Sequence, residues 1–258
     1  MAEKLLIDKH GRVTTLTINR PEVRNALDDE VAVALRQAVE ACAGDGTRCI
    51  VLTGANGNFC SGADIKQAVE RGVTPERVQH TLTECYHPAL RAIRCSPWPV
   101  IAAVDGYAAG IGFDFALTCD LRLASERARF AELFARVGLI PDGGGTYLLP
   151  RVVGLGRALE LMFSGRDVLA DEALRIGLAN AVYSAASFAD DVAAFAAGLA
   201  AQSPHALRRG KAAMLAALDA AYDAALAQEA AYQGEIFAQP DGLEGFAAFV
   251  QRRAPAWD

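Results

Sequence analysis

The chain has 258 residues, of which 52% are hydrophobic and 22% are charged, and its formal net charge is −6. This length suits one large domain or a domain with an appendage, and the composition predicts a large buried core. The negative net charge argues against nucleic acid and against an anionic membrane as the main partner.

Neither the cysteines nor the apolar segments indicate secretion or a membrane location. The six cysteines include no CxxC pair and no spacing with histidine that is typical of a metal site, so buried, reduced thiols are expected rather than disulfides or zinc. No basic-then-apolar signal region precedes the first predicted strand. The longest apolar run, over residues 100–124, contains three aspartates, which argues against a membrane span. We therefore expect a cytoplasmic protein.

The predicted elements alternate between strands and helices in an order that fits a repeating β-β-α unit. Residues 5–8 and 13–19 alternate between apolar and polar residues on either side of a turn, which predicts a β-hairpin. Helical spacing of apolar residues follows over 28–43. The next predicted elements are a strand over 49–54, a helix over 75–94, a strand over 99–104, a helix over 112–118, and short strands over 120–124 and 128–130. From residue 170 on, the pattern is almost wholly helical.

Two short stretches each join an apolar, strand-like run to a turn of small residues that opens a predicted helix. They are FCSGADIK at residues 59–66 and DGYAAGIG at residues 105–112. Gly62 and Gly110 suit such turns because glycine readily adopts positive φ. Backbone N–H groups at the start of a helix are unpaired, so those of Ala63 and Ile111 are predicted to bind one carbonyl oxygen as it gains negative charge. Such an oxyanion hole implies chemistry through an enolate or a tetrahedral oxyanion.

The glycines at 106, 110 and 112 also match the turn of short-chain dehydrogenases. In those enzymes the turn follows the first strand, whereas about a hundred residues precede it here. No tyrosine is followed by a lysine four positions later, and neither GxxxxGK[ST] nor GxSxG occurs. These observations argue against a nicotinamide enzyme, a phosphate-loop protein and a serine hydrolase.

Four motifs in order resemble those of the crotonase superfamily, the enoyl-CoA hydratase/isomerase family. They are NRP at 19–21 with NAL at 25–27, the two glycine turns, and GLIPDGGGT at 138–146. The resemblance implies an α/β fold, in which residues 1–195 form a crotonase-like spiral of repeated β-β-α units and residues 196–258 form a C-terminal helical trimerisation region. It also implies an acyl-CoA substrate, a homotrimer or a dimer of trimers, no metal, and no cofactor other than the CoA of the substrate.

By the same resemblance, acyl-CoA is expected to contact residues around both turns. Arg24, Lys66 and Arg252 match positions where the family meets the phosphates or the adenine of CoA, although a solvated surface charge is the alternative for each. The substrate-binding residues expected in this way are Arg24, Ala26, Gly62, Asp64, Ile65, Lys66, Gly110, Phe134 and Arg252.

The acid and base residues differ from those of the family's typical hydratases. Adding water across a conjugated double bond needs one carboxylate to activate the water and another to deliver a proton. Those hydratases have glutamates at the positions of Asp114 and Phe134. The aspartate is shorter by one methylene, and the phenylalanine cannot transfer a proton. Ordinary hydration by two glutamates is therefore not expected.

Asp142, eight residues after Phe134, is the acid that we expect to act instead. Acyl-CoA isomerases of the superfamily have an aspartate at this position. The stretch over 130–142 is most similar to the phenylacetate-pathway epoxide-isomerase group, and the dienoyl-CoA isomerase group shares the aspartate. We therefore expect Asp142, alone or together with Asp114, to isomerise a double bond as acid and base. The alternatives are a helix N-cap for Asp142 and a buried, hydrogen-bonded role for Asp114.

Three other functions stay open. Asp114 could support hydration with a water held by another group. Asp142 could be the nucleophile in thioester hydrolysis or dehalogenation, as in the aroyl-CoA dehalogenases. The chain could also be a non-catalytic relative that binds acyl-CoA or a protein.

Glu132 is a reserve candidate for an acid. On a strand it would share a face with Phe134, two residues later. A surface or structural salt bridge is the more expected role. The histidines at 80, 87 and 205 pair with no nucleophile in the sequence.

Overall fold

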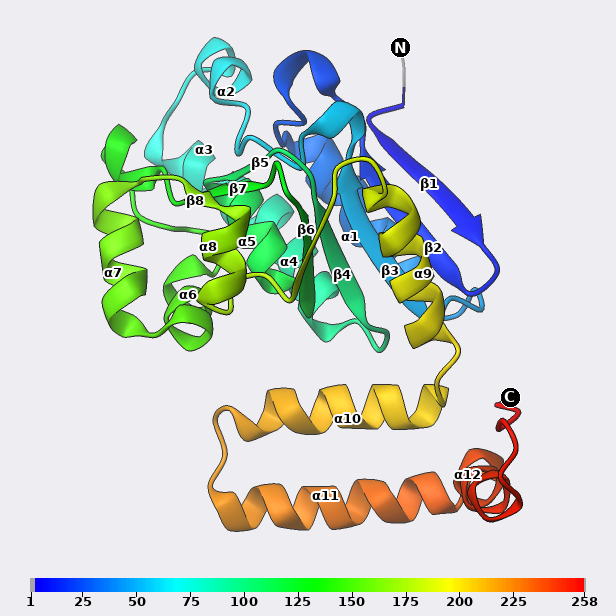
Figure 1. The fold of residues 1–258 in the computed structure, drawn as a ribbon. Helices are drawn as coiled ribbons and strands as arrows, with labels where there is room; N and C mark the ends of the chain where they lie inside the picture. Colours follow the sequence, from blue (N-terminus) through cyan, green and yellow to red (C-terminus); the bar gives the residue numbers. More distant parts are fainter. Residues whose placement is uncertain (1–2, 258) are drawn as a thin grey trace.

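The computed structural model describes residues 3–257, which form an α/β core and a helical arm at the C-terminus (Figure 1). A six-stranded sheet has the order β1-β2-β3-β4-β6-β9, and a smaller sheet has the order β5-β7-β8. β1 and β2 form the expected antiparallel hairpin, and each later neighbour in the larger sheet is parallel. The strands are β1 (Leu5–His10), β2 (Val13–Ile18), β3 (Cys49–Gly54), β4 (Val100–Val104), β5 (Tyr107–Ala109), β6 (Leu121–Ser125), β7 (Arg129–Ala131), β8 (Val168–Leu169) and β9 (Ala181–Tyr183).

Helices cover both faces of the larger sheet because its central strands are apolar on both sides. In β3, Ile50 and Leu52 pack into the cluster that contains α1, α4 and α5, whereas Val51 packs against α9. Successive strand residues point to opposite faces of the sheet, so a short continuous apolar run has side chains buried on both faces. The helices are α1 (Asp29–Ala41), α2 (Ile65–Arg71), α3 (Pro75–His80), α4 (His87–Cys95), α5 (Ile111–Thr118), α6 (Gly145–Val153), α7 (Leu155–Ser164), α8 (Ala170–Arg175), α9 (Phe188–Ala200), α10 (Pro204–Ala217), α11 (Tyr222–Phe237) and α12 (Pro240–Gln251).

A strand, a short strand and a helix follow one another repeatedly along the chain. β4, β5 and α5 form one such unit, and β6, β7 and α6 form the next. The units stack in parallel, since β4 pairs with β6 and β5 pairs with β7. In the unit before them, Cys60 takes the place of the short strand and pairs with Ala108 through an isolated bridge. The repeated β-β-α order that the sequence predicts is therefore confirmed.

The single helix predicted over 75–94 is three segments in the structure. α3 and α4 are separated by a π-helical turn over Thr81–Tyr86, and the N–H of His87 donates to the carbonyl of Leu82, five residues earlier. The cause is Pro88, which has no N–H to donate and whose ring displaces the preceding turn. Helical spacing alone does not reveal this wider turn.

The helical tail predicted from residue 170 contains one strand, β9, before α9 begins. The expected division at residue 195 falls inside α9, which packs on the sheet through Val192 and Ala196. Beyond α9, Figure 1 shows α10 and α11 as a layer beneath the core, with α12 at its far end. Lys211 of α10 joins this arm to the core, because its Nζ lies 2.6 Å from Asp120 and 3.0 Å from the carbonyl oxygen of Trp98.

All six cysteines are free thiols. Those at 42, 49, 60 and 119 are buried as expected, whereas Cys85 is partly exposed and Cys95 is exposed. In the described part of the chain, no helix combines the length and the apolar character that a membrane crossing needs.

Candidate active site

The two glycine-rich turns lie side by side. The N–H of Cys60 donates to the carbonyl of Tyr107 at 2.9 Å, and the N–H of Ala109 donates to the carbonyl of Cys60 at 3.0 Å. This pairing of residue 60 with residue 108 brings Ala63 and Ile111, three residues further along each segment, into corresponding positions. Among residues 3–257, neither the Ala63 N–H nor the Ile111 N–H finds a backbone acceptor. The two free donors that the sequence predicts are thus on neighbouring turns.

Glycine is required where these turns approach each other. Gly62 has φ of +108°, and a Cβ there would lie 3.0 Å from the carbonyl oxygen of Ala109. Gly110 has φ of +52°, and the ring of Phe134 lies 4.0 Å from where its Cβ would be. Side chains other than hydrogen would strain both positions. Phe134 is buried and packs beside the second turn.

A buried arginine, Arg20, holds the first turn in place. Its guanidinium donates to the carbonyl oxygen of Ala26 at 2.7 Å and to the carboxylate of Asp64 at 2.7 Å. Asp64 also accepts the N–H of Gln67 at 3.0 Å and so caps α2. The carboxylate of Asp64 is engaged within the chain, which gives this expected binding residue a structural role. Arg20 is not among the residues that the sequence predicts for the site, although it lies inside the NRP motif, which was the signal for it in the sequence.

The other expected binding residues are distributed unevenly. Ala26 is buried near the first turn, whereas Arg24, Ile65 and Lys66 are exposed around it. The carbonyl of Arg24 accepts the N–H of Ser61 at 3.1 Å, which ties the NAL motif to the turn. Arg252 ends α12 in the C-terminal arm, and Figure 1 shows that helix far from α2. The structure therefore does not bring Arg252 to the site within one chain.

Asp114 is completely buried in α5 and bound to the glycine-rich loop that follows Asp142. Its Oδ2 accepts the N–H of Gly143 at 2.8 Å. Burial raises the pKa of Asp114 to about 7, and the Gly143 N–H opposes that rise. Because α5 begins at Ile111, this hydrogen bond connects the second turn to the loop of Asp142.

Asp142 lines a cavity of about 430 Å³, together with His87, Arg91, Arg94, Thr118 and Tyr147. It does not cap α6, because the N-cap of that helix is Gly144 and no side chain bonds there. Oδ1 of Asp142 is buried and has no hydrogen-bond partner among residues 3–257. Burial raises the pKa of this carboxyl, and nearby His87 lowers it. The side chain is therefore free of the capping role that was its structural alternative.

His87 is a site residue that sequence reasoning did not select. Its Nε2 lies 2.8 Å from the carbonyl oxygen of Asp142. A carbonyl oxygen only accepts, so Nε2 must carry the proton. The π-helical turn before α4 orients this ring, and no local sequence signal links it to a residue 55 positions later. The cavity of Asp142 is not lined by Ala63 or Ile111, so Asp114 is the connection between the two parts of the site.

The position of Glu132 differs from both roles expected for it. β7 ends at Ala131, and Phe134 begins a short 3-10 helix over Phe134–Val137, so Glu132 and Phe134 do not share a strand face. Glu132 is 1% exposed and forms no ion pair among residues 3–257, which excludes the surface or salt-bridge role.

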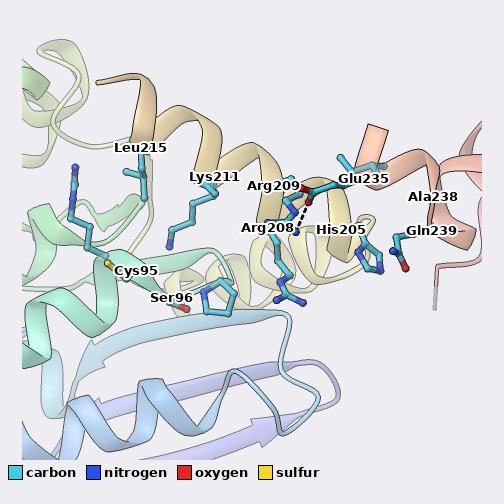
Figure 2. A pocket seen from close by; sticks show the side chains of 14 residues that line it. Cys95, Ser96, His205, Arg208, Arg209, Lys211, Leu215, Glu235, Ala238 and Gln239 are labelled. Carbon is cyan, nitrogen blue, oxygen red and sulfur yellow. Dashed lines mark ion pairs between the residues drawn. The ribbon is translucent and has the colours of Figure 1, made fainter. Parts of the chain in front are cut away.

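A second cavity, of about 740 Å³, lies between the end of α4 and helices α10 and α11 (Figure 2). Its basic side chains already have partners within the chain. Arg209 pairs with Glu235 at 2.5 Å, Lys211 pairs with Asp120, and Arg208 lies over the ring of Trp98. This cavity therefore lies at the interface between the core and the arm. In the part of the chain that the structure describes, no three His, Cys, Asp or Glu side chains are placed to hold a metal ion.

Comparisons with known proteins agree with this architecture. The profile of the family described as enoyl-CoA hydratase/isomerase matches residues 8–258. A probable enoyl-CoA hydratase of Rhodobacter capsulatus is 40% identical over 243 residues, which are 94% of this chain and 93% of the relative. The 1,2-epoxyphenylacetyl-CoA isomerase of Escherichia coli is 36% identical over 258 residues, which cover 99% and 98% of the two chains.

Solved structures give the same result. The crystal structure of an enoyl-CoA hydratase from Bacillus anthracis has a TM-score of 0.94 and 31% identity, with 99% of each chain covered. The expected crotonase-type α/β fold is confirmed by this match over nearly the whole chain. The chain belongs to the enoyl-CoA hydratase/isomerase family of the crotonase superfamily.

Proposed function

We propose that this enzyme moves a double bond along the acyl chain of an enoyl-CoA thioester, with Asp142 as the acid and base. The observation that carries the proposal is the state of Asp142, whose Oδ1 is buried at a cavity without a partner. A carboxyl whose pKa is raised by burial suits a group that must both take and return a proton.

The chemical steps balance without any further reactant. The N–H groups of Ala63 and Ile111 bind the thioester carbonyl oxygen and stabilise the negative charge that it gains. The Asp142 carboxylate removes a proton from the carbon next to the carbonyl of a 3-enoyl-CoA, which gives a dienolate. Asp142 then returns this proton to the far end of the dienolate, and the double bond becomes conjugated with the carbonyl. CoA belongs to the substrate, and no other cofactor enters the proposal.

Hydration is the second candidate, because several relatives are named hydratases. Two features of the chain argue for isomerisation instead. Phe134 lies beside Gly110 where the family's hydratases have a second acid. Asp114 is fully buried and already accepts the Gly143 N–H, so it is poorly placed to activate a water.

Incubation with 2-enoyl- and 3-enoyl-CoA thioesters in heavy-oxygen water tests the proposal. We expect a shifted double bond without a gain of heavy oxygen. Incorporation of heavy oxygen into the acyl chain would establish hydration, and release of free CoA would establish hydrolysis. Binding of the thioester with no turnover would place the chain among non-catalytic relatives, and each of these results contradicts the proposal.

We also propose that the chain assembles as a trimer or a pair of trimers. The arm exposes large apolar side chains that a lone subunit leaves uncovered, including Phe249 at 85% and Val250 at 77%. Sedimentation equilibrium should give a mass of three or six chains at micromolar concentration. Phe249→Asp should lower that mass, because a buried charge at an interface is unfavourable. A wild-type protein that sediments only as a monomer would contradict this expectation.

A further inference from the structure

Asp114 and Glu132 bring two buried carboxyl groups to the same glycine. Asp114 lies in α5 and is 0% exposed, and Glu132 follows β7 and is 1% exposed. A Cβ on Gly145 would collide with Oδ1 of Asp114 and would lie 2.9 Å from Oε1 of Glu132. Both side chains therefore converge on the Cα of Gly145, where only hydrogen fits.

Three of the four carboxyl oxygens in this pair have no hydrogen-bond donor among residues 3–257. They are Oδ1 of Asp114 and both oxygens of Glu132. The fourth, Oδ2 of Asp114, accepts the N–H of Gly143 at 2.8 Å. Buried acceptors without donors are costly, and two adjacent carboxylates in a poorly solvated site do not both ionise. A proton carried by one of the two acids supplies the missing donor.

We propose that Glu132 is a positioning residue that stays protonated and donates its O–H to the carboxylate of Asp114. Asp114 in turn accepts the Gly143 N–H and so holds the loop that carries Asp142. The pair keeps one proton and one negative charge throughout turnover, so no proton passes from it to the substrate. This inference rests on the proposed role of Asp142 in catalysis.

The electrostatic surroundings favour Glu132 as the protonated partner. Burial and, after it, the neighbouring charge of Asp114 together raise the pKa of Glu132 to about 9. Burial raises the pKa of Asp114 only to about 7. Three other charged groups lie nearby. The charge of Asp142 disfavours a second negative charge on the pair, and His87 faces Asp142. The guanidinium of Arg136 lies near Gly165 together with the main-chain carbonyl of Glu132. Asp114 accepts the Gly143 N–H, which favours its charged form, whereas neither oxygen of Glu132 has a donor among residues 3–257, so the shared proton belongs to Glu132.

A matched pair of variants separates this role from simple packing. Glu132→Gln keeps a donor for Asp114, whereas Glu132→Met has a similar length and no donor. We expect the glutamine variant to retain at least about a third of wild-type turnover at pH 7, and the methionine variant to lose at least about tenfold. Wild-type turnover should also fall above pH about 9, where the pair loses its proton, and the glutamine variant should lack this fall. Equal losses in both variants, or an unchanged alkaline fall with glutamine, would overturn the proposal.

Two measurements without substrate keep this test independent of the proposed reaction. The infrared spectrum of the wild-type protein at pH 7 should contain a protonated carboxylic acid band that Glu132→Gln removes. Because the folded-state pKa of Glu132 is raised, the stability that its proton contributes is fully present below the unfolded-state pKa of about 4 and is lost progressively as pH rises from there to about 9. The melting temperature of the wild type should therefore fall relative to that of Glu132→Gln between pH 5 and pH 9. Absence of the infrared band would overturn the role of Glu132, whereas absence of isomerisation in the wild type would overturn only the proposed function.

Discussion

Asp142→Asn should lower the turnover of a 3-enoyl-CoA by at least about a hundredfold, because proton transfer by a positioned side chain contributes on the order of 10² to 10⁴ to rate. Asparagine has nearly the same shape and keeps the contact between the main-chain carbonyl and His87. It cannot accept and return a proton. We therefore expect the loss in kcat, with little change in melting temperature or in binding of CoA thioesters.

The matched control is Asp171→Asn, which removes the same charge from an exposed aspartate at the start of α8. That variant should keep wild-type turnover. The pH profile adds a second check, because the raised pKa of Asp142 should place the acidic fall of kcat above the usual range for an aspartate. A nearly silent Asp142→Asn variant would remove Asp142 from the reaction and return hydration or simple binding to consideration.

The fold was predictable because its signals are local. The alternation of residues 13–18 predicted β2, and the apolar runs over 49–54 and 99–104 predicted β3 and β4. The turns themselves were recognisable because they need glycine at positive φ, as at Gly62 and Gly110. These features depend on neighbours in the chain and not on distant contacts.

Apart from Arg20, which lies inside the NRP motif, the parts of the site that the sequence did not place correctly depend on distant contacts. Glu132 looks like an ordinary charged residue until the end of β7, α5 and the glycine loop meet around Gly145. His87 reaches Asp142 only because the π-helical turn reorients the start of α4. Arg252 lies in an arm whose apolar faces are uncovered in one chain, so its position relative to a substrate depends on other subunits.

Ile111→Pro should lower kcat by about a hundred- to a thousandfold, which is the usual effect of removing one donor from an oxyanion hole. Ile111 is the first residue of α5, and its N–H makes no backbone hydrogen bond among residues 3–257. Proline is well tolerated at this position of a helix, because its missing N–H would be unpaired and its φ suits the first turn. The substitution therefore removes the proposed donor and leaves the α5 hydrogen bonds in place.

The control is Ile111→Val, which has as many side-chain carbons as proline at this buried position but keeps the N–H. Its kcat should stay within about tenfold of the wild-type value, so the difference between the two variants reports the donor. A thioether analogue of the substrate, which has no carbonyl oxygen, should bind the proline variant nearly as well as the wild type. If the analogue no longer binds, the proline ring has blocked the pocket, and Ala63 must then be tested as the other donor. If the proline variant still binds the analogue and also turns over the substrate at the normal rate, the second turn does not stabilise the enolate, and the role assigned to Ile111 is wrong.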